Sequence, residues 1–462
     1  MNTDDRAAGP GRRAATSTSR RPTPTAVLGM LVPLLTVGAL VLVQPDTVPD
    51  LTRDPASTSL TRTTIVCPSA VPDAETVAVA NADPEVAGQL ELDDDGEVLD
   101  IGAGEVPDTD SDAPLVIRGA DDLAPGLLAG RTGPAAATAC VSPQPEAWFT
   151  SVGAGAEHRS VLELVNPDGG PAVADITVMG PDGLLDVPAL RGVTVRGHRT
   201  ERLDLADVVP SRDDLSLHVQ VTRGRLASSV LDTVEDLGTD EVAREWLASQ
   251  AEPASTSYLL GLGAGKGDRV LAVANPSDDE VRVEIRLVAA RSEFAPAGIE
   301  ELTVAPGATA TVDLSKVLAS KAARDALGVR IDATGQVTST IRTLVDGDVT
   351  HAVAGLQLTD RSAAVVPTGT KRIVLAGITR VGEATVVMRT SSGKLLEPEV
   401  VDLDVGAAAR IRLPAKATYV EVQLARTTAV GNIELGSRGL AVLPLEPLVL
   451  SGQIADVRPA LQ

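Results

Sequence analysis

Aromatic side chains are almost absent from this chain. Among its 462 residues there are two Trp, two Tyr and two Phe, so hydrophobic cores have to be built from Val, Leu, Ile and Ala. Proteins that bind single-stranded nucleic acid stack the bases on aromatic side chains. In addition, the net charge of −23 repels the phosphate backbone and anionic lipid surfaces. Nucleic acid is therefore not expected as a partner.

Histidine is nearly as scarce. None of the four histidines stands at metal-ligand spacing with another, and the chain has no C-x-x-C pair and no G-x-S-x-G elbow. A Ser-His-Asp set could still assemble in space, but each histidine lies in or beside an expected strand, where an exposed position is the default. No catalytic, cofactor-binding or metal-binding residue is assigned, and no cofactor is expected. The four histidines are His158, His198, His218 and His351.

The chain has only two cysteines, Cys67 and Cys140. Both follow an apolar segment that places them on the outer side of a membrane, where disulfides persist. We therefore predict a disulfide between them, which closes a loop of about 73 residues and contributes roughly 4 kcal/mol on the chain-entropy account. Two separate buried thiols are the alternative.

That apolar segment, residues 26–43, holds no charged residue. A helix of this length spans roughly 27 Å, close to the ~30 Å hydrocarbon layer of a membrane. Arginines precede it and aspartates follow it, so the N-terminus is expected in the cytoplasm and the rest of the chain outside. A cleaved signal peptide is the competing interpretation, but residues 43–47 offer no small-x-small cleavage site. We predict a single-pass anchor in the cell membrane.

The remainder of the chain repeats itself. HRSVLELVNP (158–167) matches GDRVLAVANP (267–276) at an offset of 109, and a weaker third copy includes TYVEVQL (418–424). Short β-branched runs with turns every 8–12 residues are typical of antiparallel sandwiches of about 100 residues. The predicted fold is all-β, with tandem immunoglobulin-like antiparallel β-sandwiches after one N-terminal transmembrane helix.

The same patterns predict a division of the chain into seven parts. Residues 1–24 form a disordered cytoplasmic tail, 25–44 the transmembrane anchor, 45–60 a Pro-rich stalk, 61–141 a small β domain with the disulfide, 142–252 the first sandwich repeat, 253–360 the second, and 361–462 a divergent third. Stacked sandwiches of this kind predict an acidic, β-rich rod.

Two segments interrupt the strand pattern. EVAREWLASQ (241–250) and KVLASKAARDAL (316–327) are predicted helices, capped by Thr239-Asp240 and Ser315. GLGAGKGD (261–268) has part of a phosphate-loop pattern but lacks the preceding Gly and the following Ser or Thr, so a glycine hairpin turn between strands is favoured.

Three acidic residues have part of the pattern of a calcium-binding loop. Asp108, Asp110 and Asp112 have the spacing that begins a calcium loop, but its later positions do not fit, which favours solvated carboxylates. Three aromatic residues near an expected domain junction are candidate interaction residues, and core packing is their alternative role. They are Trp148, Phe149 and Trp246.

Several motifs together resemble a known family. They are the N-terminal span, the Cys67-Pro68 pair, PEAWF (145–149), LELVNP (162–167) and VMGPDGLL (178–185). The combination resembles an actinobacterial family of membrane-anchored extracytoplasmic proteins, domain of unknown function five-seven-one-nine, over most of residues 60–450. The family's Trp-Trp pair is Trp148-Phe149 here. The resemblance implies no established catalytic residue and a link with cell-envelope polysaccharide genes.

The expected function is a non-enzymatic structural or interaction module of the cell envelope, in contact with an envelope protein or glycan. The alternative is an enzyme or accessory factor that acts on envelope polysaccharide. It would need clustered carboxylates with raised pKa values, such as residues 93–95, or Asp232 with Glu235. The sequence leaves the oligomeric state open.

Overall fold

The computed structural model describes residues 56–93, 96–133, 136–235, 242–263, 265–436 and 441–454. The predicted tail and anchor, and most of the stalk, lie outside these residues. Within the described part, no helix is long and apolar enough to cross a membrane. The all-β prediction is confirmed, since antiparallel strands dominate and the described α-helices have four residues each. Residues 58–452 form one compact unit, and the features below belong to it.

Strands β2 to β9 form the first sandwich. One of its sheets has the order β2-β7-β4-β5 and the other the order β6-β3-β8-β9. The elements are β2 (Arg62–Cys67), β3 (Thr76–Asn81), β4 (Gly88–Leu92), β5 (Glu97–Ile101), β6 (Asp108–Asp110), β7 (Leu115–Ala120), η1 (Asp121–Leu123), β8 (Leu127–Thr132) and β9 (Ala137–Ala139).

Strands β10 to β18 form the second sandwich. Its sheets have the orders β10-β16-β12-β13, with β14 also on β12, and β15-β11-β17-β18. The elements are β10 (Glu146–Val152), β11 (His158–Val165), β12 (Ala172–Gly180), β13 (Gly183–Leu185), η2 (Pro188–Leu190), β14 (Val193–Val195), β15 (Thr200–Asp204), α2 (Leu205–Val208), β16 (Leu215–Arg223), β17 (Ala227–Glu235) and β18 (Val242–Leu247).

One strand of 20 residues, β25 (Ala326–Val345), belongs to both sheets of the third sandwich. Its first part pairs with β19 and β21, and its second part pairs with β20 and β26. The other elements are β19 (Ala254–Leu260), β20 (Gly267–Ala274), β21 (Val281–Ala289), β22 (Glu293–Phe294), β23 (Leu302–Val304), β24 (Thr309–Asp313), α3 (Ser315–Leu318) and β26 (Asp348–Val353).

The fourth sandwich has sheet orders β30-β29-β32-β27-β35 and β31-β28-β33-β34. A separate two-stranded sheet joins β1 (Ala56–Ser59) and β36 (Ser451–Ile454). The elements of the fourth sandwich are β27 (Arg361–Val365), β28 (Lys371–Ala376), β29 (Gly382–Arg389), β30 (Glu399–Leu403), β31 (Ala409–Leu413), β32 (Tyr419–Ala425), β33 (Val430–Leu435), β34 (Ala441–Pro444) and β35 (Glu446–Pro447).

All four sandwiches share one strand order. Each begins with a strand that pairs with the central strand of the first sheet, namely β2 with β7, β10 with β16, β19 with β25 and β27 with β32. Each second sheet ends with the equivalent edge strand, which is β9, β18, β26 or β34. The small β domain expected at residues 61–141 is the first sandwich, and it has the same topology as the other three.

An asparagine at the end of the second strand fixes the turn in three of the sandwiches. Asn166 Nδ2 donates to the carbonyls of Gly170 and Val195, and Asn275 Nδ2 donates to those of Asp279 and Val304. These partners keep the offset of 109 seen in the sequence. In the first sandwich, Asn81 accepts from the N–H of Asp83 in the same kind of turn. Asn81 is therefore a sequence signal for this additional copy.

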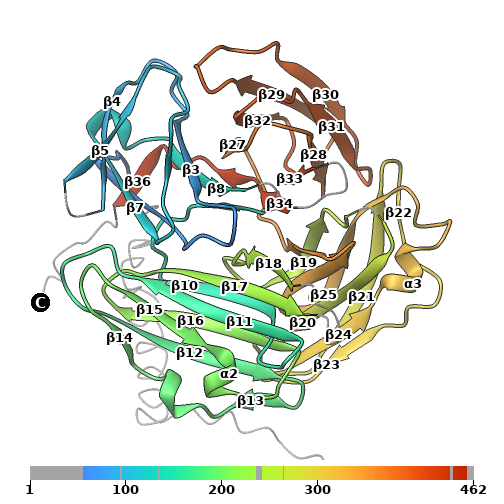
Figure 1. The fold of residues 1–462 in the computed structure, drawn as a ribbon. Helices are drawn as coiled ribbons and strands as arrows, with labels where there is room; N and C mark the ends of the chain where they lie inside the picture. The colour runs from blue at the N-terminus through green and yellow to red at the C-terminus, as the bar shows by residue number, and fades with distance from the viewer. Residues whose placement is uncertain are drawn as a thin grey trace, which may run out of the picture. The chain divides into compact units, whose positions relative to one another are not determined.

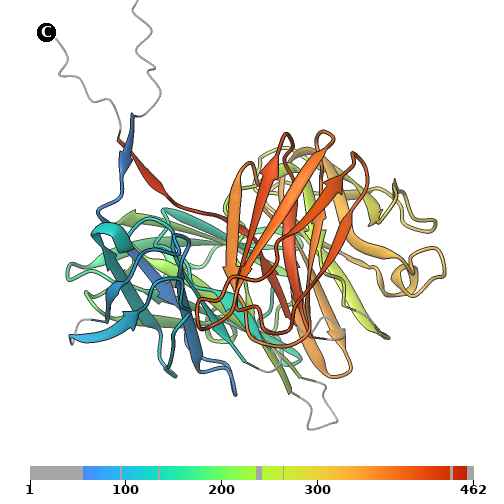
Figure 2. The same ribbon diagram turned by 90° about the horizontal axis from the view of Figure 1, so that it is seen from above.

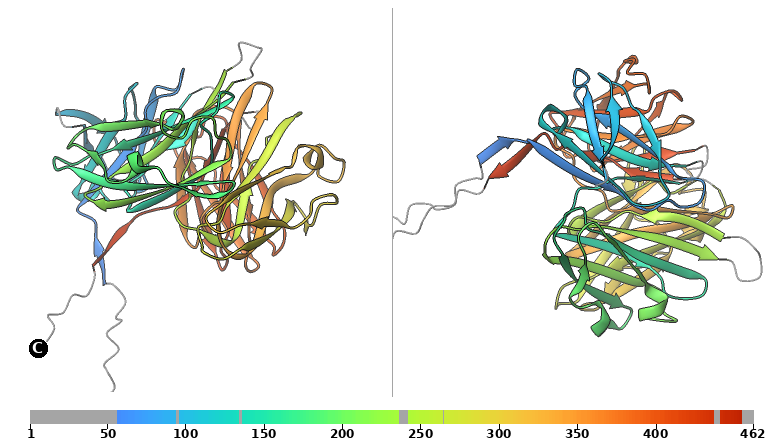
Figure 3. Two further views of the ribbon diagram at one scale, coloured as in Figure 1. Left: turned by 90° about the horizontal axis from the view of Figure 1, so that it is seen from below. Right: turned by 60° about the vertical axis from the view of Figure 1, so that its left-hand side comes forward.

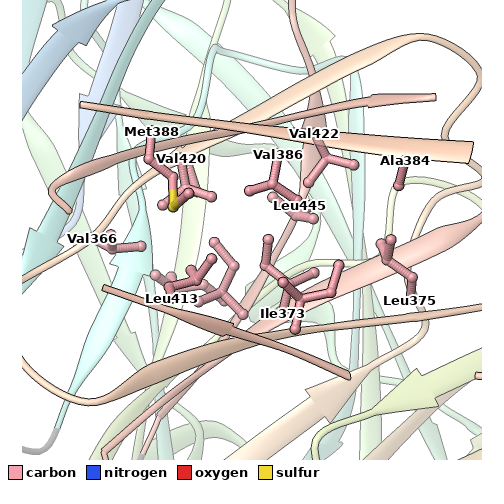
Figure 4. Close-up of a cluster of buried hydrophobic side chains, with 14 of the residues drawn as sticks. Val366, Ile373, Leu375, Ala384, Val386, Met388, Leu413, Val420, Val422 and Leu445 are labelled. Carbon is pink, nitrogen blue, oxygen red and sulfur yellow. The ribbon is translucent and has the colours of Figure 1, made fainter. Parts of the chain in front are cut away.

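Each sandwich has its own aliphatic core. Figure 4 shows the core of the fourth sandwich, where side chains from the two sheets face one another. Val386, Val420 and Val422 come from one sheet, and Ile373 and Leu413 come from the other. Alternating burial along β4 and β21 leaves one face of each strand toward solvent.

The first predicted helix is wrong, and the second is much shorter than predicted. Residues 242–247 form strand β18, in which Glu245 is buried, so a buried carboxylate hides the alternation of a strand. In the second segment only Ser315–Leu318 is helical. The Ser315 hydroxyl accepts a hydrogen bond from the Arg269 N–H instead of capping a longer helix.

The last strands of the second sheets meet at the centre of the unit. β18 contacts both β9 and β26, and β34 likewise contacts both, so the four equivalent strands form a closed hub. Figure 1 labels two of them, β18 and β34, near the centre of the unit. A cavity of about 40 Å³ lies at this hub and is lined by residues of all four sandwiches. Figure 2 and Figure 3 show the first sandwich (blue) beside the fourth (orange to red). The sandwiches therefore close into a ring, and the predicted rod is wrong.

The structure contains the predicted disulfide between Cys67 and Cys140. Because the bond closes a loop with a sequence separation of 73, its loss should release chain entropy worth about 4 kcal/mol. We expect Cys67→Ser with Cys140→Ser to lower the urea midpoint of unfolding, as measured by far-UV circular dichroism. Reductant should lower the midpoint of the parent chain and leave that of the double variant unchanged. Equal midpoints for parent and variant without reductant would contradict this prediction.

Candidate functional site

A buried polar cluster joins the second and third sandwiches. Nε2 of His158 (β11) lies 2.9 Å from Oδ1 of Asp232 (β17), and Nε2 of His351 (β26) lies 3.0 Å from Oδ2 of the same carboxylate. Ser160 Oγ donates to Oδ1. The strand pairing explains the first contact, since β11 and β17 are neighbours. His351 comes from the other sandwich, so the cluster exists only when the two sandwiches are docked.

The protonation of this cluster follows from its geometry. Burial alone would raise the pKa of Asp232, but the charges and hydrogen bonds of His158 and His351 outweigh it and hold the pKa far below its usual value. The carboxylate is therefore ionised, and an ionised carboxylate only accepts hydrogen bonds. Both imidazoles must donate through Nε2, which leaves Nδ1 of any neutral imidazole as an acceptor.

The expectation that these histidines are exposed strand residues is wrong for His158 and His351, which are each 5% exposed. A serine, a histidine and an aspartate do assemble here, but not in the order of a catalytic triad. Ser160 donates to Asp232 rather than to a histidine, and it accepts from the Gly153 N–H. Ser160 is fully buried and bonds a carboxylate rather than an imidazole, so the geometry is not that of an activated serine nucleophile.

A second buried carboxylate joins the first and second sandwiches. Glu163 (β11) accepts from the backbone N–H of Ser69 at 2.8 Å, from the Ser69 hydroxyl, and from Arg202 Nε at 2.9 Å. The indole N–H of Trp246 donates to the Ser69 carbonyl at 2.9 Å. Ser69 follows Cys67 closely, so the disulfide helps to place the residue that the second sandwich binds.

The ring also closes through polar contacts at its other two junctions. Asn432 Nδ2 of the fourth sandwich donates to the Leu260 carbonyl of the third at 2.8 Å. Arg389 of the fourth sandwich donates to the carbonyls of Asn81 and Gly104 in the first. Its guanidinium carbon also lies 3.9 Å from the ring centroid of Tyr419.

Two further carboxylates lie at the hub, on β18 and β26. Burial raises the pKa of Glu245 well above its usual value, and the nearby Asp348 carboxylate raises it further. Burial also raises the pKa of Asp348, to about 6. Within the described residues, Glu245 Oε2 and Asp348 Oδ2 are buried without hydrogen-bond partners. Burial therefore favours the protonated, uncharged form of Glu245 at the hub.

The structure buries all three aromatic candidates for interaction. Trp148 and Phe149 lie on β10 and Trp246 lies on β18, with exposures of 7%, 1% and 3%. Phe149 belongs to the core of the second sandwich, and Trp148 stacks on His218 with 3.7 Å between ring centroids. Trp246 alone reaches a neighbouring sandwich through its polar group. These residues pack the interior, which is the alternative weighed from the sequence.

The predicted carboxylate clusters do not gather at one point. Asp93 accepts from the Val116 N–H in a turn, and residues 94 and 95 lie outside the described chain. Asp232 has a lowered pKa, where the enzyme alternative required a raised one. Asp108 and Asp110 are exposed on β6. Within the described residues, no group of three or more His, Cys, Asp or Glu side chains could hold a metal ion.

The glycine loop before β20 connects two strands, as predicted, but the predicted hairpin is wrong, because β19 and β20 pair with different parts of β25 and not with each other. Its carbonyls point inward and accept from Arg269, whose guanidinium bonds Leu262, Gly263 and Gly265. A phosphate cradle needs the backbone N–H groups to converge on the ligand. The described carbonyls converge on the protein's own arginine instead.

The fold and these junctions define a protein of tandem antiparallel β-sandwiches that dock through buried polar groups. By comparison with known families, the chain belongs to the family of unknown function (DUF5719), which matches residues 122–414. The curated proteins give no match. One solved structure, titled as the crystal structure of a tetra-tandem repeat in the extending region of a large adhesion protein, is 10% identical and covers 89% of this chain and 98% of its own. Its TM-score is 0.11, so the likeness carries no argument.

Asp232→Asn should destabilise the chain strongly, because an amide cannot accept all the hydrogen bonds that now satisfy the carboxylate. Breaking a buried charged pair costs about 3–5 kcal/mol, so we expect a lower urea midpoint at pH 7. A lowered folded-state pKa contributes stability above the unfolded pKa of about 3.9 that is lost as the pH falls. The difference in urea midpoint between the variant and the parent should therefore become smaller at acidic pH. Asp402→Asn, at an exposed position on β30, is the matched control, and equal loss in both variants would refute the argument.

Glu245→Gln should stabilise the chain above neutral pH, whereas Asp232→Asn should destabilise it. A raised folded-state pKa means that the folded chain holds a proton that the unfolded chain releases above about pH 4.3, so stability falls as the pH rises through that window. Glutamine carries no such proton. We expect the variant to unfold at a higher urea concentration than the parent at pH 8 and at a similar one at pH 4. Glu399→Gln, exposed on β30, should match the parent at both pH values, and a lower midpoint for Glu245→Gln at pH 8 would contradict the prediction.

Proposed function

We propose that this protein is a non-enzymatic structural or interaction module of the cell envelope, held at the outer face of the membrane by residues 25–44. The observation that carries the proposal is the ring of four sandwiches, in which every junction contains a buried hydrogen bond between neighbouring sandwiches. Domains with small wet interfaces are expected to move relative to one another. Buried polar groups satisfied only across an interface oppose such movement, because separation leaves them unpaired.

A ring of this kind can hold the outer surfaces of its sandwiches at fixed positions relative to one another. The second and third sandwiches share Asp232, and the first and second share Glu163. Since each carboxylate is fully buried, shifting one sandwich would leave a charge unpaired in a region of low polarity. The outer faces are thereby held at set positions for an envelope protein or glycan.

Anchorage outside the membrane is supported by independent features. The uncharged run at residues 26–43 follows arginines and precedes aspartates, the arrangement expected when the following domains are translocated. The disulfide between Cys67 and Cys140 suits an oxidising compartment. The enzyme alternative draws less support, because Glu245, a carboxylate whose pKa burial raises, is only 3% exposed.

Crosslinking of the full-length chain in native membranes tests this proposal. We expect the chain to stay with membranes after a carbonate wash and to keep residues 1–24 by mass spectrometry. Protease added outside should digest residues 58–452, and crosslinks should join these residues to envelope protein or glycan. Release as a soluble chain that begins after residue 44 would refute the anchor. Absence of any envelope adduct from an anchored chain would refute the interaction role.

A further inference from the structure

Three connecting segments meet at one end of the second sandwich. They are the turn after β11, the connection from β14 to β15 and the turn from β16 to β17. The His198 N–H donates to the Asp168 carbonyl, and the Asn166 N–H donates to the Arg199 carbonyl. The Arg225 guanidinium donates to both oxygens of the Asp168 carboxylate. These contacts join the three segments into one group of loops, called the basic loops below.

The basic loops are rich in arginine, although the chain has 63 acidic residues and 40 Lys and Arg. The first sandwich adds Arg118, which donates to the Pro167 carbonyl. Hydrogen bonds from Arg225 hold the pKa of the Asp168 carboxyl below its usual value, and the nearby Arg118 lowers it further. The basic residues at this end are Arg118, Arg196, His198, Arg199, Arg223 and Arg225, and the acidic residues beside them in the sequence are Asp168 and Glu201.

Three of these arginines have no carboxylate partner within the described part of the chain. Arg196, Arg199 and Arg223 are exposed and form no ion pair with another described residue. Like charges that lie close together repel one another. A carboxylate of the chain could remove that cost, and the chain has an excess of carboxylates. Arginines left together without one are therefore available to an anionic ligand.

The third sandwich folds the same end without these charges. Its Asn275 N–H donates to the Ala308 carbonyl, as the Asn166 N–H does to the Arg199 carbonyl. The fold therefore does not require the basic side chains, and a role in binding accounts for them. The third sandwich has APGA (305–308) and ATGQ (333–336) where the second has RGHR (196–199) and TRGR (222–225).

The chemistry of the basic loops favours a hydrophilic anionic polymer. Guanidinium groups bind carboxylate and phosphate through paired N–H donors. None of the exposed large apolar side chains of the described chain lies in these loops, so they lack both a group to insert into a membrane and the apolar centre of a protein interface. A membrane would also meet the acidic remainder of the chain, whereas a polymer strand can contact the loops alone, because salt screens charges beyond about 8 Å.

We propose that the basic loops bind an anionic polysaccharide of the cell envelope, one that carries carboxylate or phosphate groups. The inference rests on the envelope role proposed above and names the chemistry of the glycan. Arg196, Arg199 and Arg223 supply guanidinium groups to the polymer, and Arg225 is held beside them by Asp168.

The test is the binding of two fluorescein-labelled probes, oligogalacturonate and phosphorylated dextran, to the full-length chain in neutral detergent, followed by fluorescence anisotropy. Plain dextran is the neutral reference. For Arg196→Ala with Arg199→Ala and Arg223→Gln, we expect about tenfold weaker binding, since three exposed charge contacts are lost. The matched control, which should bind as the parent does, removes three exposed arginines of the third and fourth sandwiches. It is Arg291→Ala with Arg324→Ala and Arg412→Gln.

Equal weakening in the two variants, equal binding of plain dextran, or no binding of either anionic probe at millimolar concentration would overturn the proposal. Tighter binding to phosphatidylglycerol vesicles, with the same dependence on the loop variant, would overturn it in favour of a membrane surface. If the loops fail this test while envelope crosslinks persist in native membranes, the envelope role stands with a different surface. If the crosslinks are absent but the probes still discriminate the variants, the loops bind anionic glycan and the envelope role fails.

Discussion

The carboxylate of Asp232 joins two sandwiches because neither sandwich alone can satisfy it. One donor histidine comes from the same sheet and the other from the neighbouring sandwich. Separating the sandwiches would remove one of the three side chains that bond this buried carboxylate, and a buried charge that loses a partner is far more costly than an exposed one. Docking is therefore part of folding for the second and third sandwiches.

Because aromatic residues are scarce, polar contacts between sandwiches matter more for the stability of the chain. The cores consist mainly of Val, Leu, Ile and Ala, and small aliphatic cores in domains of this size give modest stability. The largest aromatic side chains are used where sandwiches meet or pack tightly. Trp246 donates to Ser69 across one junction, and Tyr419 stacks with Arg389 at another.

The sequence predicts the repeated framework better than the contacts between copies. The offset of 109 between Asn166 and Asn275 is reproduced by hydrogen bonds at the same offset, because the turn is local and its chemistry is carried by one residue. Cys67 and Cys140 pair as two lone cysteines in one domain would. By contrast, His158 and His351 are 193 positions apart, and no pattern along the chain indicates that they share a carboxylate. The strand at residues 242–247 was missed for a related reason, since Glu245 is buried by neighbours that are distant in sequence.

The shared strand order has a consequence for the number of copies. Open arrays of repeats can gain or lose units, and their terminal units need polar caps because one face has no neighbour. In residues 58–452 the fourth sandwich reaches back to the first through Arg389, so neither end of the array is left uncovered. A fifth sandwich would have to break that contact to enter. Closure of the ring thus fixes the number of sandwiches in residues 58–452 at four. The residues at each junction can still differ from those at the other junctions.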